Sequence, residues 1–373
     1  MKRELERIDI PGEHEARERS WAVLATAFSQ RQPVEPGRRM LRPALAIAIV
    51  VAALAAVLSP SGRAVLDEIR EVVGVERAQP ALFSLPAPGR LLVSSDAGVW
   101  IVEQNGSKRL LGDYRDASWS PFGRFVVAAR ENELAALEPD GDVRWTLARP
   151  GVRSPRWTGT ESDTRIAYID RTGVRIVAGD GTGDRLLAAG GRGPIAWRPE
   201  AGFELAYTDR RGRVVLVDAD TGDVLWRTGR DGRVIGLEWS SDGRRLVARR
   251  RHARDDLAVY TARGALYTGF RTDGVITSAA TRPRTHARAV AVLANGQSRL
   301  FVPDVRGSAL SGPGALEGLT WSPAGRWLLV AWPSADQWVF VRVDGKRIRA
   351  VSNVSEQFRS GSFPRIEGWL ASG

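Results

Sequence analysis

The sequence contains three closely similar stretches, which read Ser118-Trp119-Ser120-Pro121-Phe122-Gly123-Arg124, Glu238-Trp239-Ser240-Ser241-Asp242-Gly243-Arg244 and Thr320-Trp321-Ser322-Pro323-Ala324-Gly325-Arg326. In each stretch a tryptophan is followed by a serine, a Pro-x-Gly or Ser-x-Gly segment and an arginine, and a short apolar run comes next. Proline fixes φ and glycine accepts a positive φ, so each stretch predicts a tight turn between two strands. The chain is therefore expected to repeat one β-hairpin.

Weaker copies extend this repeat along the chain. They begin at Trp157 and Trp197, and Thr281 takes the tryptophan place in a degenerate copy. The positions 119, 157, 197, 239, 281 and 321 are separated by 38, 40, 42, 42 and 40 residues. We place a first copy at Leu85-Pro86-Ala87-Pro88-Gly89-Arg90, with Leu85 in the tryptophan place, which brings the number of copies to seven. A period near forty residues is typical of repeat architectures.

Each repeat holds a second turn between short β-prone runs. These turns read Pro139-Asp140-Gly141-Asp142, Gly181-Thr182-Gly183-Asp184, Asp220-Thr221-Gly222-Asp223 and Val343-Asp344-Gly345-Lys346. Four short strands per unit of about forty residues is the pattern of a propeller blade. We therefore predict an all-β, seven-bladed β-propeller of four-stranded blades. Burial of apolar surface favours indoles between blades, so the blade core is predicted to contain Trp119, Trp157, Trp197, Trp239 and Trp321.

Residues 82–352 resemble the bacterial WD-repeat-like propellers, of the kind also found in the periplasmic propeller of the Tol system, which carry the same Trp-Ser-Pro-x-Gly-Arg turn. The resemblance implies a membrane-anchored, Tol-type propeller that serves as a binding platform. One segment, Asp218 to Trp226, also looks like a repeat of the quinone-cofactor propellers. Because a single good copy is present, we expect no quinone and no other cofactor.

The N-terminal segment, residues 1–39, is charged and contains a predicted amphipathic helix at 12–31. Four apolar side chains fall on one face of this helix at positions i, i+3, i+4 and i+7; they are Trp21, Leu24, Ala25 and Phe28. An isolated helix of this length is marginally stable in water. We therefore predict that this stripe of four residues binds a protein partner.

Residues 43–58 form an uncharged, alanine-rich apolar run, which we interpret as the centre of a transmembrane helix at 40–59. A buried helix of a soluble domain and a cleaved signal peptide are the alternatives. Arg38, Arg39 and Arg42 crowd the N-terminal flank, so the positive-inside bias predicts a cytoplasmic N-terminus and an extracytoplasmic body. The expected order is completed by a juxtamembrane amphipathic helix and linker at 60–80 and the propeller at 81–373.

Composition narrows the possible chemistry. The chain has no cysteine, which excludes disulfides, thiolate metal sites and a cysteine nucleophile. Its net charge of +11 comes almost entirely from arginine and is spread along the chain, so we expect no nucleic-acid partner. The histidines, His14, His252 and His286, lie in separate segments, and the Asp-Gly pairs are ordinary hairpin residues. No catalytic and no metal-binding residue is predicted.

These observations favour a non-enzymatic, membrane-anchored extracytoplasmic propeller that senses or scaffolds a ligand or protein. One alternative is an anti-sigma-like transmembrane regulator that acts through the N-terminal helix. The other is a propeller hydrolase, which requires a cluster of Asp, Glu, Arg or His side chains at the central funnel.

Overall fold

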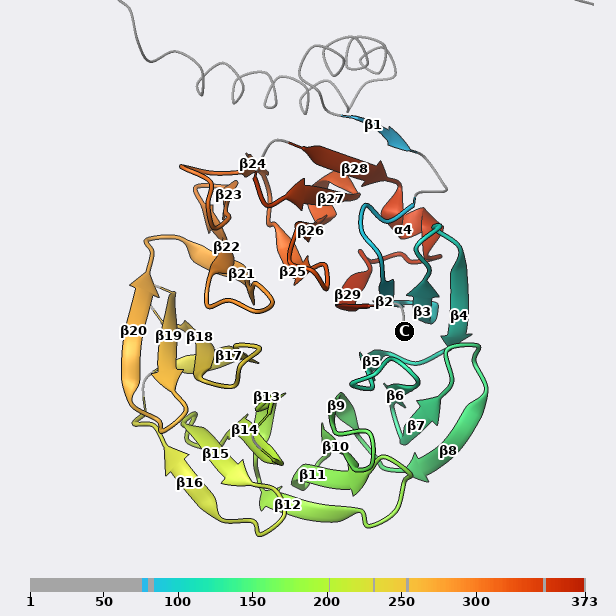
Figure 1. Ribbon diagram of the computed structural model, residues 1–373, viewed down its shortest axis with the longest axis vertical. Helices are drawn as coiled ribbons and strands as arrows, with labels where there is room; N and C mark the ends of the chain where they lie inside the picture. Colours follow the sequence, from blue (N-terminus) through green and yellow to red (C-terminus); the bar gives the residue numbers. More distant parts are fainter. Residues whose placement is uncertain are drawn as a thin grey trace, which may run out of the picture. The chain divides into compact units, whose positions relative to one another are not determined.

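The computed structural model describes residues 76–79, 84–200, 202–230, 232–252, 255–344 and 347–371. Within these residues, seven β-sheets follow one another around a common centre (Figure 1). Six sheets have four strands and one has five. The predicted seven-bladed β-propeller of four-stranded blades is confirmed.

The strands of each blade are given from the innermost to the outermost. Blade 1 contains β29 (Arg365–Leu370), β2 (Arg90–Ser95), β3 (Gly98–Val102) and β4 (Lys108–Gly112). Blade 2 contains β5 (Asp116–Trp119), β6 (Val126–Arg130), β7 (Glu133–Leu137) and β8 (Val143–Ala148). Blade 3 contains β9 (Arg153–Gly159), β10 (Thr164–Ile169), β11 (Gly173–Ala178) and β12 (Arg185–Ala189). Blade 4 contains β13 (Arg192–Trp197), β14 (Glu204–Thr208), β15 (Val214–Asp218) and β16 (Val224–Arg227).

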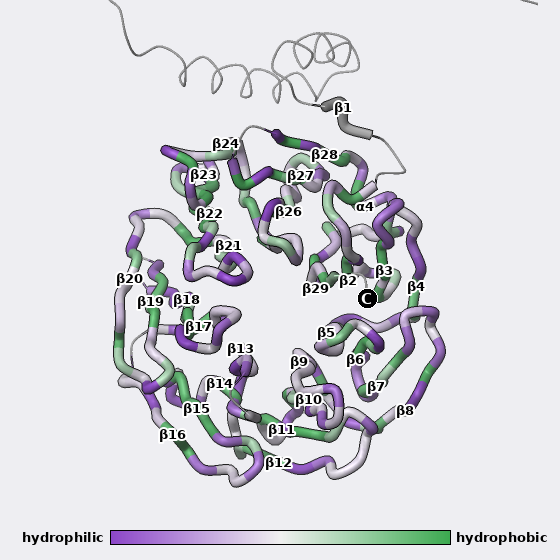
Figure 2. The backbone as a smooth tube through the Cα atoms, viewed as in Figure 1, coloured by the Kyte–Doolittle hydropathy of each residue, from purple (hydrophilic) through white to green (hydrophobic). Residues whose placement is uncertain are grey.

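The remaining blades continue in the same order. Blade 5 contains β17 (Arg233–Trp239), β18 (Arg245–Arg251), β19 (Asp256–Thr261) and β20 (Leu266–Arg271). Blade 6 contains β21 (Val275–Thr281), β22 (Arg288–Ala294), β23 (Gln297–Phe301) and β24 (Leu310–Pro313). Blade 7 contains β25 (Glu317–Trp321), β26 (Trp327–Trp332), β27 (Gln337–Arg342), β28 (Ile348–Ser352) and the edge strand β1 (Glu76–Gln79), with the short helices η1 (Pro333–Ala335) and α4 (Val354–Gln357) beside these strands in the sequence. In Figure 2 the middle strands, such as β6 and β15, are mainly hydrophobic.

The repeated serine closes the turn after the tryptophan. Ser120 Oγ accepts a hydrogen bond from the Phe125 N–H at 2.9 Å, and the Ser120 N–H donates to the Phe125 carbonyl at 2.9 Å. The same side-chain bond forms at Ser240 and Ser322. Gly123, Gly243 and Gly325 have φ between +62° and +67°, which explains why glycine recurs there.

The five predicted core tryptophans are buried, with 5–9% of their surface exposed. Each packs in a cluster that joins two neighbouring blades; Trp119, for example, lies with Leu92 and Ile101 of blade 1. Thr281 occupies the sixth place and is also buried. These five indoles therefore lie in the apolar cores between neighbouring blades.

Arginines reinforce several of these junctions. The Nε of Arg198 in blade 4 donates to the carbonyl of Gly243 in blade 5 at 2.8 Å, and its guanidinium lies 5.5 Å from the ring centre of Trp239. Arg90 and Arg282 make the corresponding contacts with blades 2 and 7. An arginine over an indole adds a cation–π attraction to the burial of both groups.

The ring closes through a residue that the repeat pattern does not predict. Trp369 of β29 pairs with Leu91 of β2, just as Trp119 pairs with Val126 in blade 2. Its ring lies edge-on to Phe340 of blade 7, with 5.8 Å between the ring centres. The assignment of Leu85 to the tryptophan place was therefore wrong, because the inner strand of blade 1 comes from the other end of the chain.

A fifth strand extends blade 7 within the segment expected to be the linker. β1 pairs in parallel with β28, the outermost strand of the repeat unit. The predicted helices at 12–31, 40–59 and in the N-terminal part of 60–80 lie outside the described residues. Across the described ranges, no helix has both the length and the apolar character required to cross a bilayer.

The closure of the ring can be tested at Trp369. We expect Trp369→Ala to lower the free energy of unfolding by about 3–5 kcal/mol, because a large buried side chain is lost from the core. Trp119→Ala, at the equivalent place of blade 2, serves as the matched comparison. Chemical denaturation followed by circular dichroism measures both, and a loss below about 1 kcal/mol for Trp369→Ala would contradict its role in closure.

Candidate functional site: a charged chamber at the centre of the ring

A chamber of about 420 Å³ is lined by the innermost strands of five blades and by β18, the second strand of blade 5. Six charged side chains line it, three acidic and three basic; they are Asp116, Glu317, Glu367, Arg156, Arg249 and Arg365. Thr277 and Ser278 of β21 add hydroxyl groups to the wall. The cluster of acids and arginines that a propeller hydrolase requires is therefore present at the centre.

Four of the charges form two pairs. Arg156 Nη1 lies 3.6 Å from Asp116 Oδ1, and the Ser154 N–H donates to Asp116 Oδ2 at 2.7 Å. Arg365 Nη2 lies 3.3 Å from Glu367 Oε1. Burial and the negative charge of Asp116 raise the pKa of Glu367, whereas Arg156 and Arg365 oppose this shift. Glu367 thus keeps its proton to a higher pH than an exposed glutamate does.

Arg249 projects from β18 into the same chamber. Its Nη1 donates to the carbonyls of Ile276 and Thr277. Burial lowers the pKa of its guanidinium, but an arginine side chain stays charged in a protein. Gly236 lies directly against it, since a Cβ at this glycine would come 3.3 Å from Arg249 Nε. In the described part of the chain, no carboxylate oxygen lies within 4.0 Å of this guanidinium.

Glu238 lies beside the chamber, in β17. Its Oε1 accepts a hydrogen bond from the Thr281 N–H of blade 6 at 2.9 Å. The side chain retains some accessible surface, but protein atoms surround the carboxyl group, and this burial raises its pKa to about 7. The Thr281 N–H and Arg288 work in the opposite direction. The hydrogen bond from Thr281 favours the ionised carboxylate, but the cost of burying the charge outweighs it, so the folded protein favours the protonated form of Glu238.

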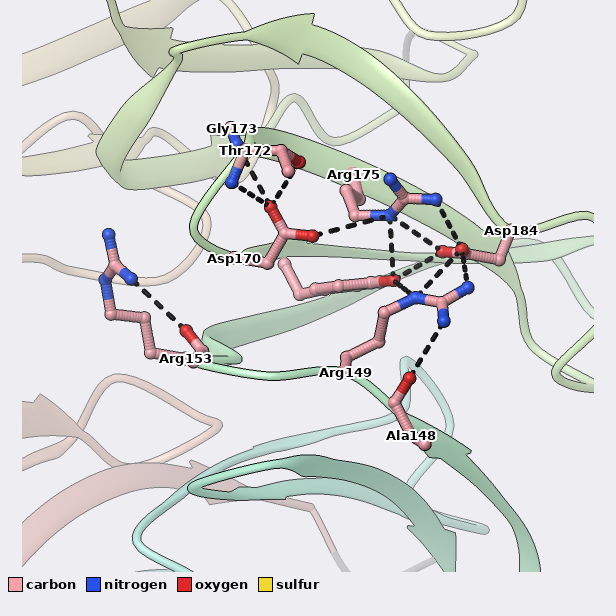
Figure 3. A network of polar contacts seen from close by, with 10 residues as sticks. Ala148, Arg149, Arg153, Asp170, Thr172, Gly173, Arg175 and Asp184 are labelled. Atoms are coloured by element: carbon pink, nitrogen blue, oxygen red, sulfur yellow. Dashed lines mark hydrogen bonds and ion pairs between the residues drawn. The ribbon is translucent and has the colours of Figure 1, made fainter.

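A second polar network lies away from the chamber, between blades 2 and 3 (Figure 3). Asp184 accepts hydrogen bonds from Arg149, Arg175 and the Tyr168 hydroxyl. Arg175 Nε also lies 3.8 Å from Asp170 Oδ2. Burial, followed by the bond to Asp184, raises the pKa of Tyr168 to about 12. Because its charges are paired, we assign this network to joining the blades.

The outer strand of blade 5 is the most exposed strand of the ring. All six residues of β20 are exposed, and three of them are large and apolar: Leu266 at 64%, Tyr267 at 61% and Phe270 at 44%. We call Leu266–Arg271 the β20 edge. Outermost strands have a free row of backbone groups, which can pair with a further strand. On blade 7, β1 already occupies such an edge.

The predicted partner-binding residues all precede the propeller in the sequence. Trp21, Leu24, Ala25 and Phe28 lie outside the described residues, as does the apolar run at 43–58. His252 lies 3.8 Å from Asp256, which is buried, and His286 lies 3.4 Å from Asp242, so the two histidines belong to two separate pairs. Among the residues that the structure describes, no group of three metal-ligating side chains is found.

The chamber could have been noticed in the sequence. Three of its charged residues lie one to four positions before a repeat tryptophan; they are Asp116, Arg156 and Glu317. A strand that ends at the tryptophan is the innermost strand of its blade, and its preceding residues therefore lie near the centre. This signal identifies candidate residues, but it does not show which of them meet.

The carboxyl of Glu238 predicts a pH-dependent stability. A folded-state pKa of about 7, against an ordinary value of 4.5, means that the folded chain binds the proton more tightly. Its contribution to stability is therefore lost as the pH rises from about 4.5 to about 7. Glu238→Gln keeps an acceptor for the Thr281 N–H and removes this loss, so we expect the variant to be more stable than the natural protein at pH 8, by at most about 3 kcal/mol.

Thermal unfolding of both proteins at pH 5 and pH 8 measures this difference. At pH 5 the two midpoints should lie close together. Equal pH dependence in the two proteins would show that Glu238 is not the responsible group.

Solved structures that resemble the described propeller show its fold. The Myceliophteria thermophila Cps50 (Swd1) β-propeller domain aligns with a TM-score of 0.52 at 14% identity, over 72% of this chain and 99% of that chain. The BBS1N chain, solved in complex with ARL6DN, aligns with a TM-score of 0.50 at 16% identity, over 69% of this chain and 90% of that chain. No protein-family model and no curated protein sequence matches this chain. At such low identity, the likeness establishes a β-propeller and no narrower family.

Proposed function

We propose that this protein is a non-enzymatic binding platform, anchored in a membrane by residues 43–58, whose propeller captures a protein partner outside the cytoplasm. The N-terminal stripe of Trp21, Leu24, Ala25 and Phe28 binds a second partner inside. The observation that carries the proposal is the β20 edge, which exposes three large apolar side chains on an outermost strand that pairs, among the described residues, with β19 on one side only. The solved structure of BBS1N with ARL6DN offers an example of a similar propeller fold in a protein complex.

The charges around the β20 edge indicate the chemistry of the exported partner. Arg271 is 71% exposed on the strand itself, Arg263 is exposed in the preceding turn, and Arg251 is 52% exposed on β18. The neighbouring carboxylates of Asp255 and Asp256 are buried against arginines. A basic, apolar edge favours an extended segment with acidic and apolar residues. A second copy of the same edge would bring arginine against arginine.

Site-specific cross-linking in the native membrane tests both surfaces. Few lysines are present in the chain, so a photoreactive phenylalanine is introduced at Arg263, beside the β20 edge, and separately at Ser20, beside the stripe. Leu266→Glu with Phe270→Glu should reduce the exported cross-links at least fivefold, because the new charges repel an acidic strand. Trp21→Ala with Phe28→Ala should remove the cytoplasmic cross-links only.

Each double variant controls for the other, since a global loss of folding or of membrane insertion would remove both sets of cross-links. Leu110→Glu, on the outer strand of blade 1, is the matched surface control. Unchanged cross-links in both double variants would overturn the proposal.

A second candidate function, hydrolysis in the chamber, is favoured by one observation. Glu367 has a raised pKa and lies near the carboxylate of Asp116, and such a pair suits general acid catalysis. If the chamber hydrolyses a substrate, Glu367→Gln should lower kcat at least 100-fold on chromogenic glycosides or esters, whereas Glu131→Gln, at an exposed glutamate, should not. No turnover of either substrate class by the natural protein would remove this candidate.

A further inference from the structure

We propose that the central chamber binds a small amino carboxylate, such as a free amino acid or a dipeptide, between Arg249 and Glu317. This inference concerns a small-molecule site at the centre of the ring and does not depend on the partner surfaces proposed above. It rests on which charges of the chamber have partners and which do not.

The chamber has two charges left over after its ion pairs are counted. Asp116 pairs with Arg156, and Glu367 pairs with Arg365. Arg249 bonds to backbone carbonyls, which are neutral. Within the described ranges, the carboxylate of Glu317 has no basic nitrogen within 4.0 Å. The unpaired groups are thus one cation and one anion.

The two leftover groups attract each other without touching. The negative charges of Asp255, outside the chamber lining, and of Glu317 both act favourably on Arg249, that of Asp255 more strongly. Among the described residues, neither carboxylate lies within 4.0 Å of the Arg249 guanidinium. Arg249 extends from blade 5 and Glu317 from blade 7, and the chamber separates them. A molecule that fills this space meets a positive group on one side and a negative group on the other.

Burial strengthens the preference of the Arg249 guanidinium for an anionic partner. A guanidinium removed from water loses hydration that neutral carbonyls replace only in part. Arg249 is fixed by its two carbonyl acceptors and by contact with Gly236, so it is prepared to bind a carboxylate without further ordering. Glu317 is exposed to the chamber and is suited to an ammonium group.

The opposite charges exclude simpler ligands. A lone anion would pair with Arg249 but would be repelled by Glu317. A lone cation would pair with Glu317 but would be repelled by Arg249. A zwitterion satisfies both at once, and Thr277 and Ser278 add hydroxyl groups to the wall of the chamber. A volume of about 420 Å³ lies within the usual range for small-molecule pockets.

Isothermal titration of the full-length protein in detergent tests the proposal. The probes are L-leucine and L-leucyl-L-leucine, which distinguish an amino acid from a dipeptide. The matched controls are N-acetyl-L-leucine, which lacks the ammonium charge, and L-leucinamide, which lacks the carboxylate. We expect at least one zwitterion to bind at least tenfold more tightly than both controls.

Variants of the two leftover charges make the test specific. Arg249→Gln and Glu317→Gln should each weaken binding of the zwitterion at least tenfold. Glu317→Gln should also narrow or reverse the difference in affinity between the zwitterion and N-acetyl-L-leucine. If Arg249→Gln does not fold, Arg249→Lys, which keeps the positive charge, is measured in its place. Arg244→Gln, at a guanidinium side chain that is 76% exposed, is the control variant and should bind normally.

Three outcomes would overturn the proposal. They are the absence of binding by either zwitterion, equal binding of a singly charged control, and unchanged affinity in both charge variants. Loss of the cross-links at the β20 edge would leave this result unaffected, because that edge and the chamber use different residues.

Discussion

Each blade of this propeller can bury both faces only when another blade packs on either side. The tryptophan at the end of the inner strand fills the space where two sheets approach, and its burial supplies a large part of the apolar surface at each junction. A row of such blades with free ends would expose two apolar faces to water. Closure of the ring is therefore the constraint on which the rest of the structure depends, and β29 meets it by joining the end of the chain to blade 1.

Closure also explains why charged groups gather at the centre. Side chains of one inner strand accept hydrogen bonds from backbone N–H groups of the next, as Ser118 does from Trp157, Glu238 from Thr281 and Ser278 from Leu319. These bonds cross the junctions where no strand pairing is available. The same crowding removes water from Glu238, Glu367 and Arg249, which shifts the pKa of each. The residues in and beside the chamber thus both join neighbouring blades and place charged groups at the centre.

The outer strands obey a different constraint. The outermost strand of a blade pairs on one side only, so its other backbone edge is open unless another segment covers it. β1 covers this edge on blade 7, whereas the residues of β20 on blade 5 are exposed. The propeller therefore offers two kinds of surface, a rigid polar chamber at the centre and an adaptable edge at the rim, and each suits a different class of ligand.

Much of the fold follows from short-range chemistry in the sequence. The Ser-Pro-x-Gly turn is closed by groups at most five residues apart, and the spacing of the tryptophans gives the number of blades, so both were predictable. The Asp184 turn was predicted as a hairpin, but its bonds to Arg149 and Tyr168 were not, because those residues come from other strands.

The set of residues that meet in the chamber could be predicted even less well. Asp116, Arg156 and Glu317 could be recognised one by one as neighbours of repeat tryptophans, yet Asp116 and Glu367 come from opposite ends of the propeller sequence. Trp369 likewise escaped the repeat pattern because its turn and its paired strand lie at the start of the propeller. The blades can be recognised from sequence alone, since each blade is held by local turns and by its own pattern of apolar residues. Which charges meet and which stay unpaired depends on the closure of the ring, and this pairing is visible only in three dimensions.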